Sequence, residues 1–399
     1  MIPLPSIEDW EGKKTLVRLD LNLPTDREGR VTDRSRLDLP LPTLQALRAG
    51  GSPLILMSHR GSPGGHPEGD LSLAPFLPLL EEAIGCRVHF TGASIGPEVR
   101  KSVDRLKGGE ILLLENMRFH PGEEDPNSFP EFIEEIASYG EGYVNEAFSV
   151  SHRPHGSIVS LPHYFPRDRA AGLAFLEERE RLDLLLLHPE TPFVACFGGA
   201  KVESKVGAIR GVLPRLSALM IGGGMAFPFL AAQGRDIGDF PLTPSQLLEA
   251  REIIALCHDQ GVDLHLPNDM VAEGPDGSPA LLSMEEGIPE GWQGKDIGPS
   301  TLDRWEGALR KAGTLFWNGP MGVFEEERFS WGTQSLAERL ASAAGITVVG
   351  GGDTLAAIHR LGRSSAFDYL STAGGALLSY LSSGGELIGE QALSSKLNP

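Results

Sequence analysis

Histidine and arginine side chains follow apolar runs at three places in the first half of the chain. His59 comes after SPLILM, Arg118 follows EILLL, and His152 and Arg153 lie in FSVSHRPHGS. If each run is a strand of a parallel sheet, these side chains stand at its carboxyl edge, where open α/β sheets bind ligands. Guanidinium groups form paired hydrogen bonds with phosphate and carboxylate. Each residue alone also fits a surface pair or a loop histidine, but the repetition predicts a site for a small anion.

Asp20, Asn22 and Arg36 add polar groups to this candidate anion site. Asp20 and Asn22 alternate with apolar residues in RLDLNLP, so both point to the same face of the predicted strand. Such residues at a strand exit are more often turn formers. Arg36, in DRSRLDLPLPTL, is equally compatible with a solvated charge before a helix.

The second half of the chain carries glycine, lysine and aspartate where the first half carries arginine and histidine. In FGGAKVESK, Lys201 and Lys205 are spaced i and i+4, which predicts one face near the start of a helix. Helix N-termini attract phosphate, and lysine adds a mobile positive charge. The Walker pattern is absent. A glycine run at 350–352 leads into Asp353 and Thr354, an acid placed to hold Mg²⁺.

Two further glycine-rich segments lie in this half. GGGMAFPFL at 222–230 repeats the order of strand, glycine and helix, and WNGPMGVFE ends in Glu325. A carboxylate at Glu325 can accept hydrogen bonds from ribose hydroxyls, although a plain loop explains the segment as well. Three glycine runs in one half favour a site for a nucleotide and its metal.

Short apolar runs alternate with helical patterns along the whole chain, which predicts parallel sheets covered on both faces. Helical spacing occurs at 129–140 and 243–261. The apolar runs lie at 15–23, 52–58, 86–90, 110–116, 191–199, 216–224, 314–320 and 346–353.

A long helical pattern lies near the midpoint, at 169–190, and fits either one more packing helix or a helix that connects two domains. The length of 399 residues favours more than one domain. We therefore predict an N-terminal domain at 1–168, a connecting helix at 169–190 and a C-terminal domain at 191–383. The polar tail, about 384–399, is expected to pack back on the first domain.

The composition excludes several classes of protein. Acidic residues outnumber basic ones by 54 to 35, and a net charge of -19 disfavours nucleic acid and anionic membranes as partners. Three cysteines without paired spacing favour a reducing compartment. The sequence MIPLPSIEDWEGKK lacks the basic and apolar regions of a signal peptide, so we expect a cytoplasmic protein.

Ten short signatures together resemble the phosphoglycerate kinase family almost from end to end. They are, in order, RLDLNLP, LLENMRFH, SHRPH, GGAKVESK, GGGMAFPFL, DIGPST, WNGPMGVFE, FSWGT, GGGDT and STAGG. The resemblance implies two Rossmann-like α/β domains joined by a long interdomain helix. It also implies a monomer that transfers a phosphoryl group reversibly between 1,3-bisphosphoglycerate and ADP, giving 3-phosphoglycerate and ATP, by direct in-line transfer after hinge closure.

The resemblance assigns roles to the positions that match the family's motifs. It implies that Arg36 and Lys201 are catalytic and stabilise the transferring phosphoryl group. It implies that 3-phosphoglycerate is held by Asp20, Asn22, Arg36, His59, Arg118, His152 and Arg153. It implies that ATP or ADP, with Mg²⁺ on Asp353, is held by Lys205, Glu325, Gly351, Gly352, Asp353 and Thr354.

The chain departs from the family's pattern at a few positions. The family's arginine in SHLGRP is Ser62 here, and Arg60 is a candidate substitute two residues upstream. Glu146 replaces an aspartate, Asn268 replaces the valine of LPVD, and Ala373 replaces a glycine. These changes leave two alternatives: a nucleotide-binding regulatory or scaffolding protein derived from the kinase, and an unrelated two-domain kinase that acts on another small acid.

Overall fold

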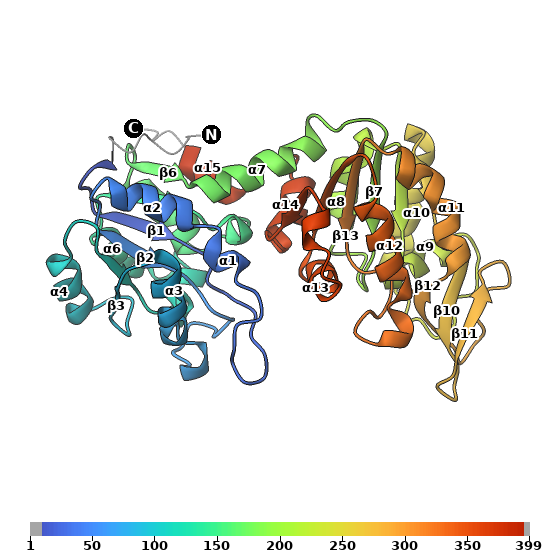
Figure 1. The fold of residues 1–399 in the computed structure, drawn as a ribbon, viewed down its shortest axis with the longest axis horizontal. Helices are drawn as coiled ribbons and strands as arrows, with labels where there is room; N and C mark the ends of the chain where they lie inside the picture. The colour runs from blue at the N-terminus through green and yellow to red at the C-terminus, as the bar shows by residue number, and fades with distance from the viewer. Residues whose placement is uncertain (1–9, 395–399) are drawn as a thin grey trace. The chain divides into compact units, whose positions relative to one another are not determined.

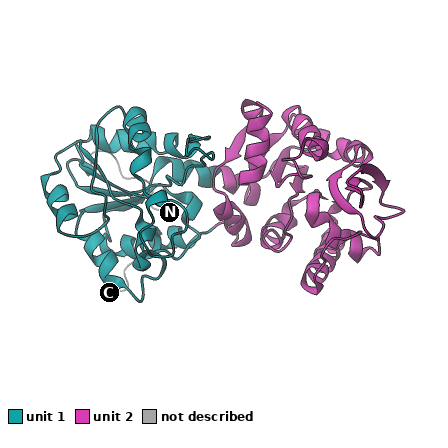
Figure 2. Ribbon diagram, turned by 90° about the horizontal axis from the view of Figure 1, so that it is seen from below, with its two compact units in different colours: residues 1–180, 386–399 teal, residues 181–385 magenta. Residues whose placement is uncertain are grey.

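The computed structural model describes residues 10–394 of the chain. Within them, residues 10–180 together with 386–394 form one compact unit, and residues 181–385 form a second (Figure 2). Residues 1–9 of the predicted N-terminal domain and 395–399 of the predicted tail lie outside the described residues. No helix in the described part of the chain is long and apolar enough to cross a membrane.

The N-terminal unit, whose strands β1, β2, β3 and β6 are labelled in Figure 1, is built on a six-stranded sheet. The strand order is β3-β4-β2-β1-β5-β6. All neighbouring strands are parallel, with Thr15 opposite Leu54 on one side and Gly142 on the other. The strands are β1 (Thr15–Arg18), β2 (Leu54–Met57), β3 (Val88–Phe90), β4 (Ile111–Leu113), β5 (Gly142–Asn145) and β6 (Arg169–Ala171). Because the central strands are buried on both faces, they are apolar almost throughout.

Helices surround this sheet, and the C-terminal helix belongs to the same unit. Val17, Leu56, Leu113 and Val144 join the helices in one apolar core. The helices are α1 (Ser35–Asp38), α2 (Leu41–Ala49), α3 (Leu77–Ile84), α4 (Pro97–Arg105), α5 (Pro121–Glu124), α6 (Pro130–Ala137) and α15 (Ile388–Ser394). Helix α7 (Leu173–Leu186) begins in this unit, and the division between the two units falls within it, after Glu180. Helix α15 contacts β6 and the segment Gly156–Tyr164.

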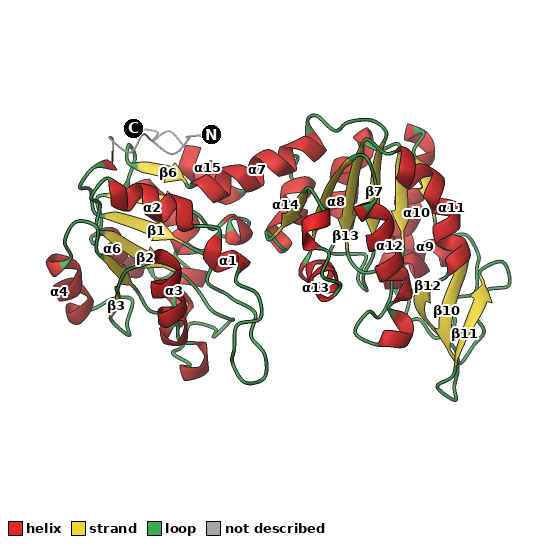
Figure 3. Cartoon of the chain, in the orientation of Figure 1, coloured by secondary structure: helices red, strands yellow, loops and turns green. Residues whose placement is uncertain are grey.

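The C-terminal unit repeats this architecture with the strand order β15-β14-β13-β7-β8-β9, again all parallel (Figure 3). Its strands are β7 (Phe193–Phe197), β8 (Ala218–Ile221), β9 (Asp263–His265), β13 (Thr314–Asn318), β14 (Ile346–Gly350) and β15 (Tyr369–Ser371). Its helices are α8 (Val206–Val212), α9 (Ala226–Ala232), α10 (Pro244–Gln260), α11 (Pro299–Lys311), α12 (Trp331–Ala341), α13 (Gly352–Arg360) and α14 (Gly375–Ser382). The core includes Trp305 and Trp317. The predicted α/β class and parallel sheets are confirmed.

A small antiparallel sheet in this unit was not predicted. Its order is β11-β10-β12, formed by β10 (Asp269–Glu273), β11 (Pro279–Ser283) and β12 (Gln293–Ile297). A tight turn at Gly277, where φ is 79°, joins the first two strands. Exposed and partly buried residues alternate along β11, so no continuous apolar run marks it in the sequence.

The helical prediction for 169–190 is wrong at both ends. Residues Arg169–Ala171 form strand β6 beside β5, and helix α7 covers only Leu173–Leu186. The buried carboxylate of Glu146 explains the change at the first end, because it accepts hydrogen bonds from the backbone N–H groups of Ala174, at 3.2 Å, and Phe175, at 2.9 Å. These groups are unsatisfied in the first turn of any helix, so Glu146 marks where the strand ends and α7 begins.

Gly172, between β6 and α7, offers a test of this packing. A Cβ atom added there would lie 2.2 Å from the carboxyl carbon of Glu146. We expect Gly172→Ala to lower the free energy of unfolding by about 1–3 kcal/mol, because the buried carboxylate must move. Urea unfolding followed by circular dichroism measures the effect. Gly69→Ala, in the same unit and with open space around its Cβ, is the matched control and should change stability by less than about 0.5 kcal/mol. Equal effects of the two substitutions would contradict the close packing of Gly172 against the carboxylate of Glu146.

Candidate functional site

The predicted anion-binding residues gather at the carboxyl edge of the N-terminal sheet. Asp20 follows β1, His59 follows β2, Arg118 follows β4, and His152 and Arg153 lie in the loop after β5. These four strands are consecutive neighbours in the sheet, in the order β4-β2-β1-β5. Their loops therefore converge, as the sequence predicted.

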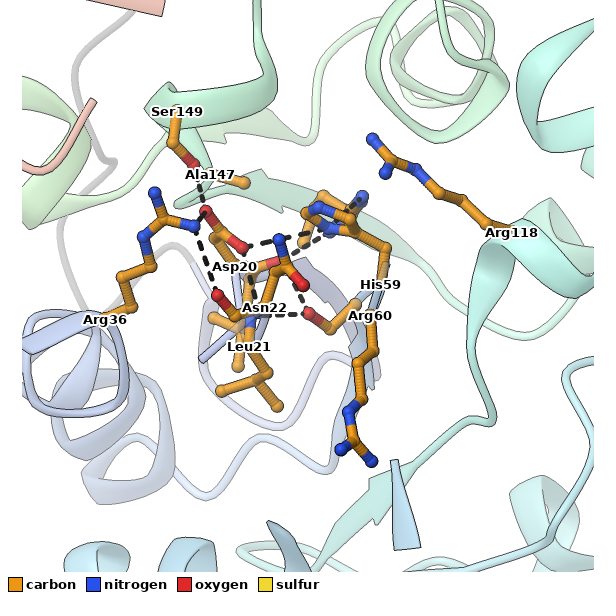
Figure 4. Close-up of polar contacts among 12 residues, drawn as sticks. Asp20, Leu21, Asn22, Arg36, His59, Arg60, Arg118, Ala147 and Ser149 are labelled. Atoms are coloured by element: carbon orange, nitrogen blue, oxygen red, sulfur yellow. Dashed lines mark hydrogen bonds and ion pairs between the residues drawn. The ribbon is translucent and has the colours of Figure 1, made fainter. Parts of the chain in front are cut away.

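Asp20 is the centre of a polar cluster at this edge (Figure 4). Its buried carboxylate lies 2.9 Å from a guanidinium nitrogen of Arg36 and accepts hydrogen bonds from the hydroxyl of Ser149 and the backbone N–H of Asn22. Burial alone would raise the pKa of Asp20, but the nearby positive charge and these hydrogen bonds bring it below its ordinary value. Asp20 is therefore ionised at neutral pH, and it holds Arg36 at the edge of the sheet.

Asn22 and His59 connect this cluster to the loop after β2. The side-chain oxygen of Asn22 accepts a hydrogen bond from the backbone N–H of Gly61 at 2.9 Å, and its backbone oxygen accepts one from Arg36 at 3.3 Å. His59 is 2% exposed. Burial and the surrounding arginines lower the pKa of His59 well below its ordinary value, so its ring is neutral near pH 7.

Arg118 presents a guanidinium group with unused hydrogen-bonding capacity. One terminal nitrogen donates to the backbone oxygen of Gly61 at 2.6 Å, while its buried Nε has no hydrogen-bond partner among residues 10–394. Burial, aided by the charges of Arg18 and Arg153, lowers the pKa of Arg118 to about 10, which leaves it charged at neutral pH. The Nδ1 atoms of His152 and His155 are likewise buried and without a hydrogen bond in the described structure, and that of His155 lies 3.8 Å from a carboxylate oxygen of Glu123. Such groups suit an anion that brings its own acceptors.

Sequence reasoning missed the buried residues behind this edge. Arg18 and Glu123 form a buried ion pair at 3.5 Å, and Ser157 donates hydrogen bonds to Glu123. The alternation in RLDLNLP held a signal for Arg18, since residues 18, 20 and 22 share one face of an extended strand. No pattern in the sequence marks Glu123 or Ser149.

The carboxyl edge of the C-terminal sheet contains a cavity of about 400 Å³. Loops after β7, β13 and β14, which are neighbours in the sheet, line it together with Gly374, Gly375 and Leu378. The predicted residues in its lining are Lys201, Lys205, Gly351, Gly352, Asp353 and Thr354. Glu325 is exposed and does not contribute to the lining. Asn318 and Ser204 line the cavity without having been predicted.

Glycine is required where these loops approach one another. A Cβ atom on Gly198 would lie 2.3 Å from the backbone oxygen of Pro320. Gly319 has a φ of 99°, and a Cβ atom there would lie 2.2 Å from the Nζ atom of Lys205. The bare backbone thus lets the lysine ammonium reach the strand ends.

Lys205 is buried at this junction, whereas Lys201 is exposed. The ammonium of Lys205 donates to the backbone oxygens of Gly198 and of Asn318, the latter at 3.1 Å. Burial lowers the pKa of Lys205 to about 8, and the charge of Asp353 opposes this shift. Lys205 therefore joins the ends of β7 and β13 and faces the carboxylate of α13.

The prediction that Lys201 and Lys205 share one helical face is wrong. Helix α8 begins at Val206, and Lys205 is its N-cap residue. The preceding residues form a turn in which the backbone N–H of Lys205 donates to the oxygen of Val202 at 2.9 Å. The i, i+4 spacing resembled a helix because the sequence does not show where the turn after the glycines ends.

The cavity also fits a magnesium nucleotide. Asp353 lies in the first turn of α13 and lines the cavity. Mg²⁺ in phosphoryl-transfer sites is usually held by one or two carboxylates together with substrate phosphates and water. Residues 10–394 contain no group of three or more acidic, histidine or cysteine side chains able to hold a metal alone. A single carboxylate beside a phosphate cradle agrees with metal brought in by the nucleotide.

Two α/β units, one with convergent arginines and the other with a glycine-lined cavity that presents lysine and aspartate, define a phosphotransferase of the kinase class. The sequence model for phosphoglycerate kinase matches residues 6–384. Phosphoglycerate kinase of Moorella thermoacetica is 44% identical over 395 residues, covering 98% of this chain and 99% of the relative. That of Leptospira biflexa is 41% identical over 394 residues, covering 98% of each. The chain therefore belongs to the phosphoglycerate kinase family.

Solved structures agree with this assignment. Phosphoglycerate kinase from Coxiella burnetii superposes with a TM-score of 0.83 at 32% identity, covering 96% of this chain and 97% of the other. The enzyme from Pyrococcus horikoshii OT3 has the same TM-score at 28% identity and covers 98% of both chains. The match thus extends over both units.

The guanidinium of Arg60 is engaged by Ser72 and Phe76. Its guanidinium donates to the backbone oxygen of Ser72 at 3.0 Å and lies 4.7 Å from the ring centre of Phe76. In Figure 4 its side chain extends away from the cluster around Asp20. These contacts weigh against Arg60 as a substitute, which stays a prediction to be tested by kinetics. Ser62 instead lies near Arg118, with 3.5 Å between its hydroxyl and a guanidinium nitrogen.

The lowered pKa of Lys205 can be tested on the free protein. Below pH about 8 the amine is charged, and above it the neutral, nucleophilic form prevails. We expect Asp353→Asn to lower the pKa of Lys205 further, because the carboxylate favours the ammonium form. Acetic anhydride labelling over pH 6–10, followed by mass spectrometry of the peptide, measures the titration. Asp353→Glu keeps the charge and is the control. An unchanged profile in Asp353→Asn would show that the two groups are not coupled.

Proposed function

We propose that this chain transfers a phosphoryl group reversibly between 1,3-bisphosphoglycerate and ADP, giving 3-phosphoglycerate and ATP. The main support for this function is the set of side chains at the strand ends of each unit. In one unit, the ends of three strands present arginine and histidine donors, and the end of the fourth, β1, presents Asp20, which holds Arg36. In the other unit, three adjacent strand ends form a glycine-lined cavity with lysine and aspartate. The first set is complementary to a small carboxylate phosphate and the second to a magnesium nucleotide.

The acid-binding roles belong to the N-terminal unit. Arg36, Arg118 and Arg153 supply guanidinium groups for the phosphate and carboxylate of 3-phosphoglycerate, and Asp20 and Asn22 position Arg36 and accept from the substrate's hydroxyl group. His59 and His152 complete the set as neutral donors. Nε of Arg118 and Nδ1 of His152, which have no hydrogen-bond partner among residues 10–394, support these roles.

The nucleotide-binding roles belong to the C-terminal unit. Gly351, Gly352 and Thr354 hold phosphate with the backbone at the start of α13, together with Lys205. Asp353 is the protein ligand of Mg²⁺, which neutralises phosphate charge when bound. Glu325, exposed on the loop after β13, is proposed to accept hydrogen bonds from the ribose.

Arg36 and Lys201 act on the transferring group. No side chain has to remove a proton, because a carboxylate is already a nucleophile and an acyl phosphate is already activated. Catalysis then consists of positioning and charge stabilisation by these two cations. We further propose a monomer in the cytoplasm that acts on these small molecules without a nucleic-acid partner.

A coupled assay run in both directions tests this function. ATP-dependent phosphorylation of 3-phosphoglycerate and formation of ATP from 1,3-bisphosphoglycerate and ADP should both occur. A regulatory or scaffolding protein would bind nucleotide without turnover, and a kinase for another acid would prefer a different substrate in a panel of small carboxylic acids.

Lys201→Ala separates catalysis from binding. We expect kcat to fall by about 10² to 10³ while the Kd for ATP changes little, because an exposed lysine aimed at the migrating group acts mainly in the transition state. Steady-state kinetics and equilibrium titration measure the two quantities. Lys311→Ala, exposed in α11 of the same unit, is the control. A normal kcat in Lys201→Ala would remove its catalytic role.

Arg60→Ala tests the effect of the serine at position 62. Since Arg60 is engaged with Ser72 and Phe76, we expect its removal to change KM for 3-phosphoglycerate by less than about twofold, whether residue 62 is serine or, in Ser62→Arg, arginine. Arg118→Ala should raise the same KM about ten- to a hundredfold, since it removes charge-assisted hydrogen bonds. A severalfold effect of Arg60→Ala in the native background alone would restore the idea of compensation.

Transfer also requires the two sites to meet. Because the acid site and the nucleotide site belong to different units, and reacting atoms must approach to about 3–3.5 Å, we propose hinge closure during turnover. Small-angle scattering should give a smaller radius of gyration with both 3-phosphoglycerate and a non-hydrolysable ATP analogue than with either alone. The same radius in all three states would argue against closure.

A further inference from the structure

Arg18 is a charged residue in the middle of the N-terminal core. It is the last residue of β1, two positions before Asp20, and its side chain is fully buried. Its Nε donates to the hydroxyl of Ser157 at 2.8 Å, and one terminal nitrogen donates to the backbone oxygen of Leu19. A cation in this position is costly unless it is paired and its donors are used.

Glu123 pairs with this cation from α5. Its carboxylate lies 3.5 Å from the guanidinium of Arg18 and accepts hydrogen bonds from the hydroxyl of Ser157 at 2.6 Å and its backbone N–H at 3.0 Å. The hydroxyl of Ser157 can take part in both hydrogen bonds, because it accepts from Arg18 with its oxygen and donates its proton to Glu123. Arg18 is thereby held in one orientation.

The second terminal nitrogen of Arg18 contacts His59. It lies 3.4 Å from Nδ1 of the imidazole, within hydrogen-bonding geometry. A guanidinium can only donate, so Nδ1 must be the acceptor, and the single proton of a neutral ring must be on Nε2. The competing acceptor, a carboxylate oxygen of Asp20, is 3.8 Å from the same Nδ1, too far for a hydrogen bond.

Burial, together with three nearby arginines, favours the neutral ring of His59. Asp20 favours the charged form, whereas Arg18, Arg36 and Arg118 oppose it, and burial opposes it most strongly. No hydrogen bond to Nε2 occurs within residues 10–394. The N–H at Nε2 is therefore the donor that His59 has available for a ligand.

We propose that Arg18 is a positioning residue that holds His59 in the neutral tautomer with its proton on Nε2, so that His59 presents a donor to an oxygen of the bound acid. The tautomer follows from contacts inside the N-terminal unit. Its use by 3-phosphoglycerate rests on the proposed function. Without Arg18, Nδ1–H can turn toward Asp20, which leaves Nε2 as an acceptor that repels an anion.

The tautomer is tested on the ligand-free full chain. Two-bond ¹H–¹⁵N correlation spectra of protein labelled at histidine distinguish a protonated Nε2 from a protonated Nδ1. We expect the Nε2–H form for His59 from pH 6 to pH 8. Arg18→Met should produce a large fraction of the Nδ1–H form. Arg60→Met, which changes the residue beside His59 but not its contacts, should leave the spectrum as in the native chain.

Steady-state kinetics test whether the Nε2–H tautomer of His59 contributes to binding of the acid. Arg18→Met should raise KM for 3-phosphoglycerate about tenfold and leave KM for ATP within about twofold. His59→Gln, whose amide nitrogen can replace Nε2, should retain more affinity for the acid than His59→Asn, whose amide nitrogen corresponds to Nδ1. Equal losses in these two variants, or a rise in both KM values in Arg18→Met, would overturn the proposal.

A variant that lacks both buried charges, those of Arg18 and Glu123, shows whether the change of tautomer occurs without a folding defect. Arg18→Met combined with Glu123→Gln avoids an unpaired carboxylate, and it should show the same change of tautomer. Protonation of Nδ1 in the native chain, or an unaltered spectrum in both Arg18 variants, would refute the role of Arg18. If the chain failed to phosphorylate 3-phosphoglycerate, the proposed function would fail while the spectrum could still assign the tautomer.

Discussion

The common direction of the strands in each sheet determines where the chemistry of this protein can lie. In a parallel sheet every strand ends at the same edge, so the loops that follow neighbouring strands meet although they are distant in sequence. Asp20 and Arg118 are brought together in this way in the N-terminal unit, and Lys205 and Asp353 in the C-terminal unit. Both sites follow from this constraint, and they differ only in the residues that the loops supply.

Buried partners then orient the cations of each site before any ligand arrives. Arg36 is held by Asp20, Arg18 is held by Glu123, and Lys205 is held by backbone oxygens at the ends of two strands. A charge that is already oriented needs no reorganisation during the reaction, which is the main source of electrostatic catalysis. The cost is a set of buried ionic groups that contribute little to stability on balance.

Much of the site could be predicted from the sequence, because the end of a strand and the alternation of polar and apolar residues along it are visible in a short stretch of chain. The runs before His59 and Arg118 are confirmed as adjacent strands, and the spacing of Asp20 and Asn22 placed them at one strand exit. Long-range contacts are not visible in such patterns. The side chain of Arg60 packs against the ring of Phe76, and the buried carboxylate of Glu123 accepts a hydrogen bond from Ser157. The start of α8 is set by the hydrogen bond that closes the turn before it. The small antiparallel sheet was missed because the pattern of β11 is weak.

The overall negative charge of the chain makes short-range contacts of the arginines necessary for binding an anion. A net charge of -19 opposes the approach of an anionic acid or nucleotide, so long-range attraction cannot supply the affinity. Salt screens that repulsion over about 10 Å, while partly buried groups at contact distance are screened far less. Arg36 is held at the sheet edge by Asp20, where it can act only at short range, and Arg18 is held behind that edge by Glu123. Under the proposed function, selectivity for the acid depends on how many of its oxygens meet a donor that lacks a hydrogen bond within residues 10–394, such as Nε of Arg118.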